Sequence, residues 1–338
     1  MLPRPGISEN WIKENKIGKK IKTDYTPDDI EEPTKAIDDY ARTGIPVSNI
    51  YDRRTEEQKS KAKKWLGYLP KKINCYSWYY MGQFKVTAVN SVKWSSETIS
   101  KVFEQGELST FLELYRMRHY GVNENEIENR YIRWIVIGFL LGEIERSTLL
   151  ARMVLQAYRE NMIPTKVRPS SAGNLMLRML GEHIGESVPA LPDRFYPERP
   201  DFFDTTPYLQ EMLAHWKNEE PDVIAPYLVN VCDCHTIHGY QGKADTSHLR
   251  EFSGGGMQRF PMAALLVLKL RQMRGLENPR IEHPLMETVM GHLPTDAHFV
   301  PDDVLSRLRD RMRADGFDES EILKMYGVTG SLPAYWKH

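Results

Sequence analysis

The steadiest pattern along the chain is a helical spacing of apolar side chains. Between residues 96 and 161 apolar residues recur every three or four positions, which places them on one face of an α-helix. We therefore predict one long helix over residues 96–118. Asn123 followed by Glu126 is a capping-box pattern that predicts a second helix, and Ser147 predicts the start of a third.

The last third of the chain is divided into helices by proline and glycine. Helices are predicted between Pro261 and Gly275, between Pro284 and Gly291, and between Pro301 and Gly316, because proline favours the first turn of a helix and glycine the position after its end. A fourth, short helix is predicted from Asp318. The run at residues 262–268 has no polar face, which predicts that its helix is central.

Other parts of the chain lack a steady period. Residues 1–53 mix proline, glycine and charge, which predicts an irregular, partly helical arm. The aromatic segment 73–94 fits either a strand or a buried helix, and we assign it to helix. Residues 187–204 contain four prolines and predict a long surface loop. Further helices are predicted over residues 54–66, 174–185, 207–217 and from Pro221 onward.

Together these elements predict an all-α fold, a multi-helix bundle with an irregular N-terminal arm. The chain has 338 residues, which suffices for one large or two ordinary domains. We divide it into an N-terminal arm with the first helices (1–95), an N-terminal helical half (96–186) and a C-terminal helical half (187–338). The last two segments could form one continuous domain.

The distribution of charged residues along the chain is more informative than the net charge. The net charge is −1, so the chain as a whole is not an electrostatic binder of nucleic acid. Residues 1–101 hold nineteen Lys and Arg against thirteen Asp and Glu, whereas residues 182–222 hold ten acids against three bases. Residues 277–321 hold eleven acids against five bases. The acidic C-terminal half of the chain is complementary in charge to a basic partner.

Three cysteines, two of them one residue apart, form a poor disulfide framework and indicate a reducing compartment. The N-terminus has no apolar segment typical of a secretory signal. The longest apolar run, Trp134 to Gly142, is too short to span a bilayer. We therefore expect a cytoplasmic protein without a membrane partner.

The first candidate for chemistry is the group Cys234, His235 and His238. On a helix these side chains fall within a sector of about 100° and could hold zinc, with His248 as a fourth ligand. The alternative is a half-buried helix in which cysteine packs as a small apolar residue and histidine bonds its neighbours. We favour the alternative, because adjacent Cys234 and His235 would strain the helix at one ion.

Other motifs give no catalytic residues. Gly254, Gly255 and Gly256 precede a helix and could cradle an anion, but Met257, Gln258 and Arg259 follow where a P-loop needs Lys and Ser or Thr. The chain has no HExxH or Gly-x-Ser-x-Gly motif. We predict no catalytic residue, no metal ligand and no cofactor.

The acidic loop and its flank form the candidate partner-binding surface. Acidic side chains alternate there with aromatic ones, and aromatic residues anchor protein contacts. A solvated charged face is the alternative explanation. The candidate residues are Asp193, Glu198, Asp201, Phe202, Phe203, Asp204, Glu219, Glu220 and Asp222.

One stretch resembles a known family. The order Asp233-x-His235, Gly256, Phe260, an Ala-rich apolar helix, Leu276-Glu277-Asn278 and His283-Pro284-Leu285 is similar to the C-terminal region of bacterial immunity proteins of the PoNi-like group. The resemblance covers about residues 228–295, and the chain departs from the family pattern at Gln258 and Pro261.

The resemblance implies an all-helical protein without catalysis. Members of this group neutralise nuclease toxins of type VI secretion and related polymorphic-toxin systems. We therefore expect tight binding to a cognate toxin, and the acidic surface suits a nuclease whose own substrate channel is basic. The alternative function is a helical metal-dependent enzyme that uses Cys234, His235 and His238.

Overall fold

The computed structural model describes residues 2–14, 27–45, 69–91, 93–120, 130–163, 172–188, 204–239, 252 and 257–329. All regular structure in these ranges is helical, and no strand occurs in them. The predicted all-α multi-helix fold is confirmed. None of the described helices is long and apolar enough to cross a membrane.

The described residues form the following α-helices, in chain order. They are α1 (Glu9–Glu14), α2 (Asp28–Thr43), α4 (Leu69–Ser91), α5 (Ser96–Tyr120), α6 (Arg130–Leu140), α7 (Ile144–Arg159), α8 (Ala172–Ile184), α9 (Thr206–His215), α10 (Pro221–His238), α11 (Met262–Met273), α12 (Asp303–Ala314) and α13 (Glu319–Met325). The described residues also form three short 3₁₀ helices, η2 (Met257–Arg259), η3 (Pro284–Met286) and η4 (Val289–Gly291).

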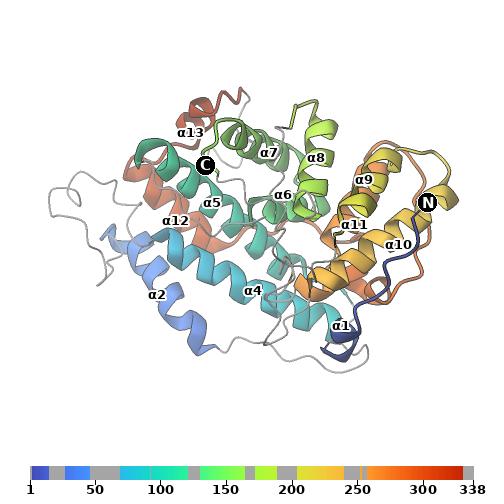
Figure 1. Cartoon of the computed structure of the whole chain (residues 1–338). Helices are drawn as coiled ribbons and strands as arrows, with labels where there is room; N and C mark the ends of the chain where they lie inside the picture. The colour runs from blue at the N-terminus through green and yellow to red at the C-terminus, as the bar shows by residue number, and fades with distance from the viewer. Residues whose placement is uncertain are drawn as a thin grey trace, which may run out of the picture.

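Helix α5 lies at the centre of the fold. It packs against α4 on one side and α6 on another, and it also contacts α13 (Figure 1). Gly106 of α5 lets α6 approach closely, because a Cβ atom there would lie 2.3 Å from the Trp134 ring. Gly138 of α6 likewise faces Ser147 of α7, where a Cβ atom would lie 2.1 Å from the Oγ atom. The three helices therefore interlock through small residues.

Helix α2 joins the start of the chain to its end. It packs against both α4 and α12. The Tyr40 hydroxyl donates to Asp315 at 3.0 Å, and Arg307 forms an ion pair with Asp38 at 3.0 Å. The N-terminal arm, which the sequence predicts to be irregular and partly helical, thus includes a long helix packed against α4 and α12.

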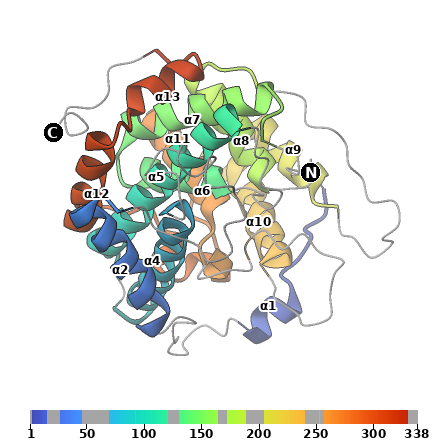
Figure 2. The ribbon, with the colours of Figure 1, turned by 90° about the vertical axis from the view of Figure 1, so that its left-hand side faces the viewer.

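A second group of helices comprises α9, α10 and α11. Helix α10 packs against α8, α9 and α11, and α11 in turn contacts α6 and α8. Figure 2 shows α2 and α4 on one side of the molecule and α10 with α1 on the other. Side chains of α11 from Met262 to Leu268 are buried, so the prediction of a central helix is confirmed.

Several predicted elements differ in detail. Residues 73–94 lie almost entirely in α4, which confirms the assignment to helix. The predicted helix from Pro284 to Gly291 is instead the pair η3 and η4, since His283 and Thr288 each start a separate single turn. Helix α7 begins at Ile144, after Gly142 and Glu143, so the prediction of a start at Ser147 is wrong. Residues 54–66, Asn123 and Glu126, and the glycines 254–256 lie outside the described residues.

Candidate functional site

The histidines of α10 are bonded to separate neighbours. His235 Nε2 lies 3.0 Å from the Met257 carbonyl oxygen, and its ring stacks on Phe252 at a centroid distance of 4.1 Å. Burial lowers the pKa of His235 to about 3, so this side chain is neutral and donates through Nε2. His238 Nε2 lies 3.0 Å from Thr205 Oγ1.

Cys234 is buried in the same helix, and so is Cys232, where burial raises the pKa of the thiol. Among the described residues no group of three or more His, Cys, Asp and Glu side chains is placed to hold a metal ion. Cys234, His235 and His238, which the sequence brings to one sector of a helix, are here part of the core packing of α10.

Asp233 of α10 accepts hydrogen bonds from residues that are distant from it in the sequence. Its carboxylate is fully buried and accepts from Arg4 Nε at 2.7 Å, from the Gly6 amide at 3.1 Å and from His283 Nε2 at 3.2 Å. Burial alone would raise the pKa of Asp233, but hydrogen bonds from His283 and Arg4 outweigh burial and lower that pKa. The ionised carboxylate therefore ties together the N-terminal segment, α10 and the segment after α11.

The N-terminal segment, residues 2–14, runs beside α10 (dark blue in Figure 1). The Ser8 amide donates to Thr236 Oγ1 at 3.0 Å, and Trp11 Nε1 donates to the Gln258 carbonyl at 2.8 Å. These contacts join residues more than 220 positions apart in sequence. No local sequence pattern could have identified them.

The structure separates the candidate acidic residues. Asp204 precedes α9, whereas Glu219, Glu220 and Asp222 lie at its other end, in the connection to α10 and its first turn. The ten residues of α9 span about 15 Å at about 1.5 Å per residue, so Asp204 lies apart from the other three. All four are exposed. The remaining candidates, Asp193, Glu198, Asp201, Phe202 and Phe203, lie outside the described residues.

We call Glu219, Glu220 and Asp222 the acidic cluster. A buried arginine holds the loop that carries it: Arg271 of α11 donates through Nη1 to the carbonyls of Trp216 at 2.8 Å and Asn218 at 2.6 Å. The Asn218 side chain also accepts from the Glu220 amide at 2.9 Å. The acidic cluster therefore stands on a fixed backbone.

The same arginine connects the acidic cluster to a second segment. Arg271 Nη2 donates to the carbonyl of Glu277, whose side chain is exposed. Two cationic side chains lie near the residues that Arg271 binds. Arg274 lies over the Trp216 ring at 4.9 Å, and Lys217 forms an ion pair with Glu182. The sequence did not reveal Arg271, because all three of its acceptors are backbone carbonyls.

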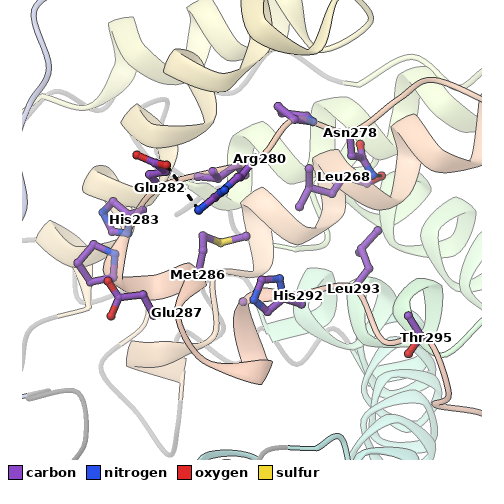
Figure 3. A pocket seen from close by; sticks show the side chains of 14 residues that line it. Leu268, Asn278, Arg280, Glu282, His283, Met286, Glu287, His292, Leu293 and Thr295 are labelled. Carbon is purple, nitrogen blue, oxygen red and sulfur yellow. Dashed lines mark hydrogen bonds and ion pairs between the residues drawn. The ribbon is translucent and has the colours of Figure 1, made fainter.

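A groove of about 880 Å³ begins next to Glu277. Figure 3 shows that one wall is the segment from Asn278 to Glu287 and the other the segment around His292 and Leu293, with Leu268 of α11 between them. The Asn278 side chain donates to the Leu268 carbonyl at 2.9 Å and fixes the start of the first wall to α11. Arg271 thus links the loop that carries the acidic cluster to the segment that leads into the groove.

A separate cluster of charges lies buried among α5, α7, α12 and α13. Arg146 donates to Glu107 through Nε at 2.9 Å, and Arg309 donates to the same carboxylate at 2.6 Å. Arg309 also lies 3.8 Å from Glu104 and 3.4 Å from Glu319. Charges that are buried and paired in this way join helices but expose no reactive group to solvent.

Burial raises the pKa of Glu104 to about 6, although Arg309 opposes this shift. Because the folded pKa exceeds the ordinary value of 4.5, this group adds stability that is full below about pH 4.5 and lost as pH rises through about 6. Relative to Glu104→Gln, we expect the wild type to gain about 2 kcal/mol in free energy of unfolding between about pH 7 and about pH 4.

Urea unfolding of both proteins at the two pH values measures this gain. The difference between wild type and variant cancels the titration of all other groups that the substitution leaves in place. A difference that does not change with pH, or changes in the opposite direction, would contradict the raised pKa of Glu104.

Comparison of the chain with protein-family models, with curated proteins and with solved structures finds no match.

Proposed function

We propose that this protein is an immunity protein that binds a cognate secreted toxin, a nuclease with a basic surface, and neutralises it by direct contact. The observation that carries the proposal is the acidic cluster on a preorganised loop. Its three carboxylates are exposed, and Arg271 fixes the backbone beneath them. A fixed surface loses little conformational entropy on binding, which favours tight association.

Charge supports the choice of partner. A nuclease binds a polyanion and therefore presents a basic channel, which an acidic protein surface complements. The exposed Glu277 extends the acidic cluster on the adjoining segment. The family resemblance over residues 228–295 includes this segment and points to the same class of partner.

Co-expression with the product of the adjacent reading frame tests this function. We expect the two proteins to purify as a stable one-to-one complex and the cell to survive a toxin that kills it when expressed alone. Size-exclusion chromatography with light scattering gives the stoichiometry. A nuclease toxin that neither forms a complex with this protein nor is inhibited by it would contradict the proposal.

A further inference from the structure

The groove that begins after Glu277 has an apolar floor and a charged rim. Leu268, Met286 and Leu293 contribute apolar side chains to its lining. Arg280, Glu282 and Glu287 are the charged lining residues and are all exposed. Figure 3 shows Arg280 and Glu282 facing each other at one end, with an ion-pair distance of 3.7 Å. This exposed pair contributes little stability and leaves both groups open to other partners.

The wall of the groove offers free backbone groups. Residues 276–282 are neither helix nor strand, and His283 has an extended backbone (φ −153°, ψ 142°). In the described part of the chain, no hydrogen bond is made by the peptide N–H groups of Asn278, Arg280, Ile281 and Glu282 or by the carbonyls of residues 278–282. Unpaired backbone groups along a segment outside regular secondary structure can pair with the backbone of a partner strand.

The wall is also held in place at both ends. Arg271 binds the Glu277 carbonyl at the start. His283, at the end, contacts Asp233 through Nε2 and accepts from the Leu285 amide through Nδ1 at 3.0 Å. A wall that is fixed before binding loses little entropy when a partner strand pairs with it.

We propose that this groove binds an extended basic segment of the toxin, which pairs through its backbone with residues 278–282. Alternate side chains of such a strand would point into the groove and contact the apolar floor. Its Lys or Arg side chains would lie beside Glu282 and Glu287. This inference rests on the proposed function for the identity of the partner.

Charge decides between a basic peptide and an anionic ligand. Two glutamates and one arginine line the groove, and the exposed Glu277 directly precedes its first wall. Arg271 links this segment to the loop that carries the acidic cluster. This excess of carboxylates repels phosphate and attracts cations. The unpaired carbonyls of residues 278–282 need N–H donors, which a peptide backbone supplies and an ionised phosphate group lacks.

Three labelled peptides of about eight residues test the groove without the toxin, by fluorescence anisotropy on the full-length protein. The first alternates lysine with leucine, the second replaces each lysine with glutamate, and the third is the lysine peptide with N-methyl groups on alternate amides. We expect the lysine peptide to bind at least about tenfold more tightly than either of the others, because only it combines positive charge with free backbone donors.

Two protein variants with equal change in charge locate the binding. Glu282→Lys with Glu287→Lys alters the groove rim, and Glu145→Lys with Glu321→Lys alters exposed positions on α7 and α13. We expect only the groove variant to weaken the lysine peptide by about tenfold or more. Absence of lysine-peptide binding, or equal affinity for the two variants, would overturn the groove proposal.

The toxin complex separates the two proposals. If the toxin binds wild type and groove variant equally, the groove proposal fails while the immunity function stands. If the peptide binds in the groove but the toxin is neither bound nor inhibited, the immunity function fails and so does the toxin as occupant of the groove, whereas the groove's preference for a basic extended peptide stands.

Discussion

Replacing Glu107 with Gln is expected to lower the free energy of unfolding by about 3–5 kcal/mol, the usual cost of removing one partner from a buried ion pair. Glu107 is fully buried and is the shared acceptor of Arg146 and Arg309. Its loss leaves two buried guanidinium groups without their main counter-charge. The Arg146 guanidinium also lies over the rings of Phe103 and Phe299, at 4.7 Å and 4.4 Å, and its side chain is buried.

Glu97→Gln on the same helix is the matched control. Glu97 pairs with Lys101 at 3.0 Å, but its side chain is 68% exposed. An exposed pair of this kind contributes at most about 1 kcal/mol, so the control should remain close to wild type in urea unfolding. If Glu107→Gln and Glu97→Gln unfold at the same urea concentration, the buried cluster does not hold the four helices together.

Replacing Arg271 with Met is expected to cost about 3 kcal/mol, because three backbone carbonyls lose a charged donor in a buried site. The effect should be local as well as global. Amide hydrogen exchange should rise in residues 216–220 and 277, since the loop loses its anchor. Toxin binding should weaken more than stability alone explains, because the acidic cluster is no longer preorganised.

Arg274→Met separates these effects from simple loss of charge. Arg274 is exposed and lies over the Trp216 ring, a contact that contributes about 0.5–1 kcal/mol. This variant changes the net charge as Arg271→Met does but leaves the carbonyl contacts in place. Equal exchange rates in the loop of both variants would show that Arg271 does not order the acidic cluster.

The sequence predicts the helices better than it predicts their contacts. Helix α11 follows from Pro261 and the apolar run after it, and α5 follows from its periodic apolar positions, because both signals are local. The segment after Pro284 carries the same proline and glycine signals but forms only η3 and η4. There, the His283 side chain caps a single turn and Thr288 starts another.

The candidate site follows from the sequence only in part. Glu219, Glu220 and Asp222 are close together in space because they are close in sequence, whereas α9 separates Asp204 from them. Arg271 could not be identified, because an arginine that binds carbonyls leaves no pattern in its acceptors. The partners of Asp233 are equally hidden, since Arg4 lies 229 positions away.

The rate of association with the toxin tests the central claim most directly. Glu219→Lys, Glu220→Lys and Asp222→Lys together reverse the acidic cluster, and Glu9→Lys, Glu145→Lys and Glu321→Lys make the same change in net charge at exposed positions elsewhere. At low salt we predict that the first triple variant associates about tenfold or more slowly than wild type, while the second changes by less than about twofold. Equal rates for the two variants would contradict the claim that the acidic cluster receives the toxin.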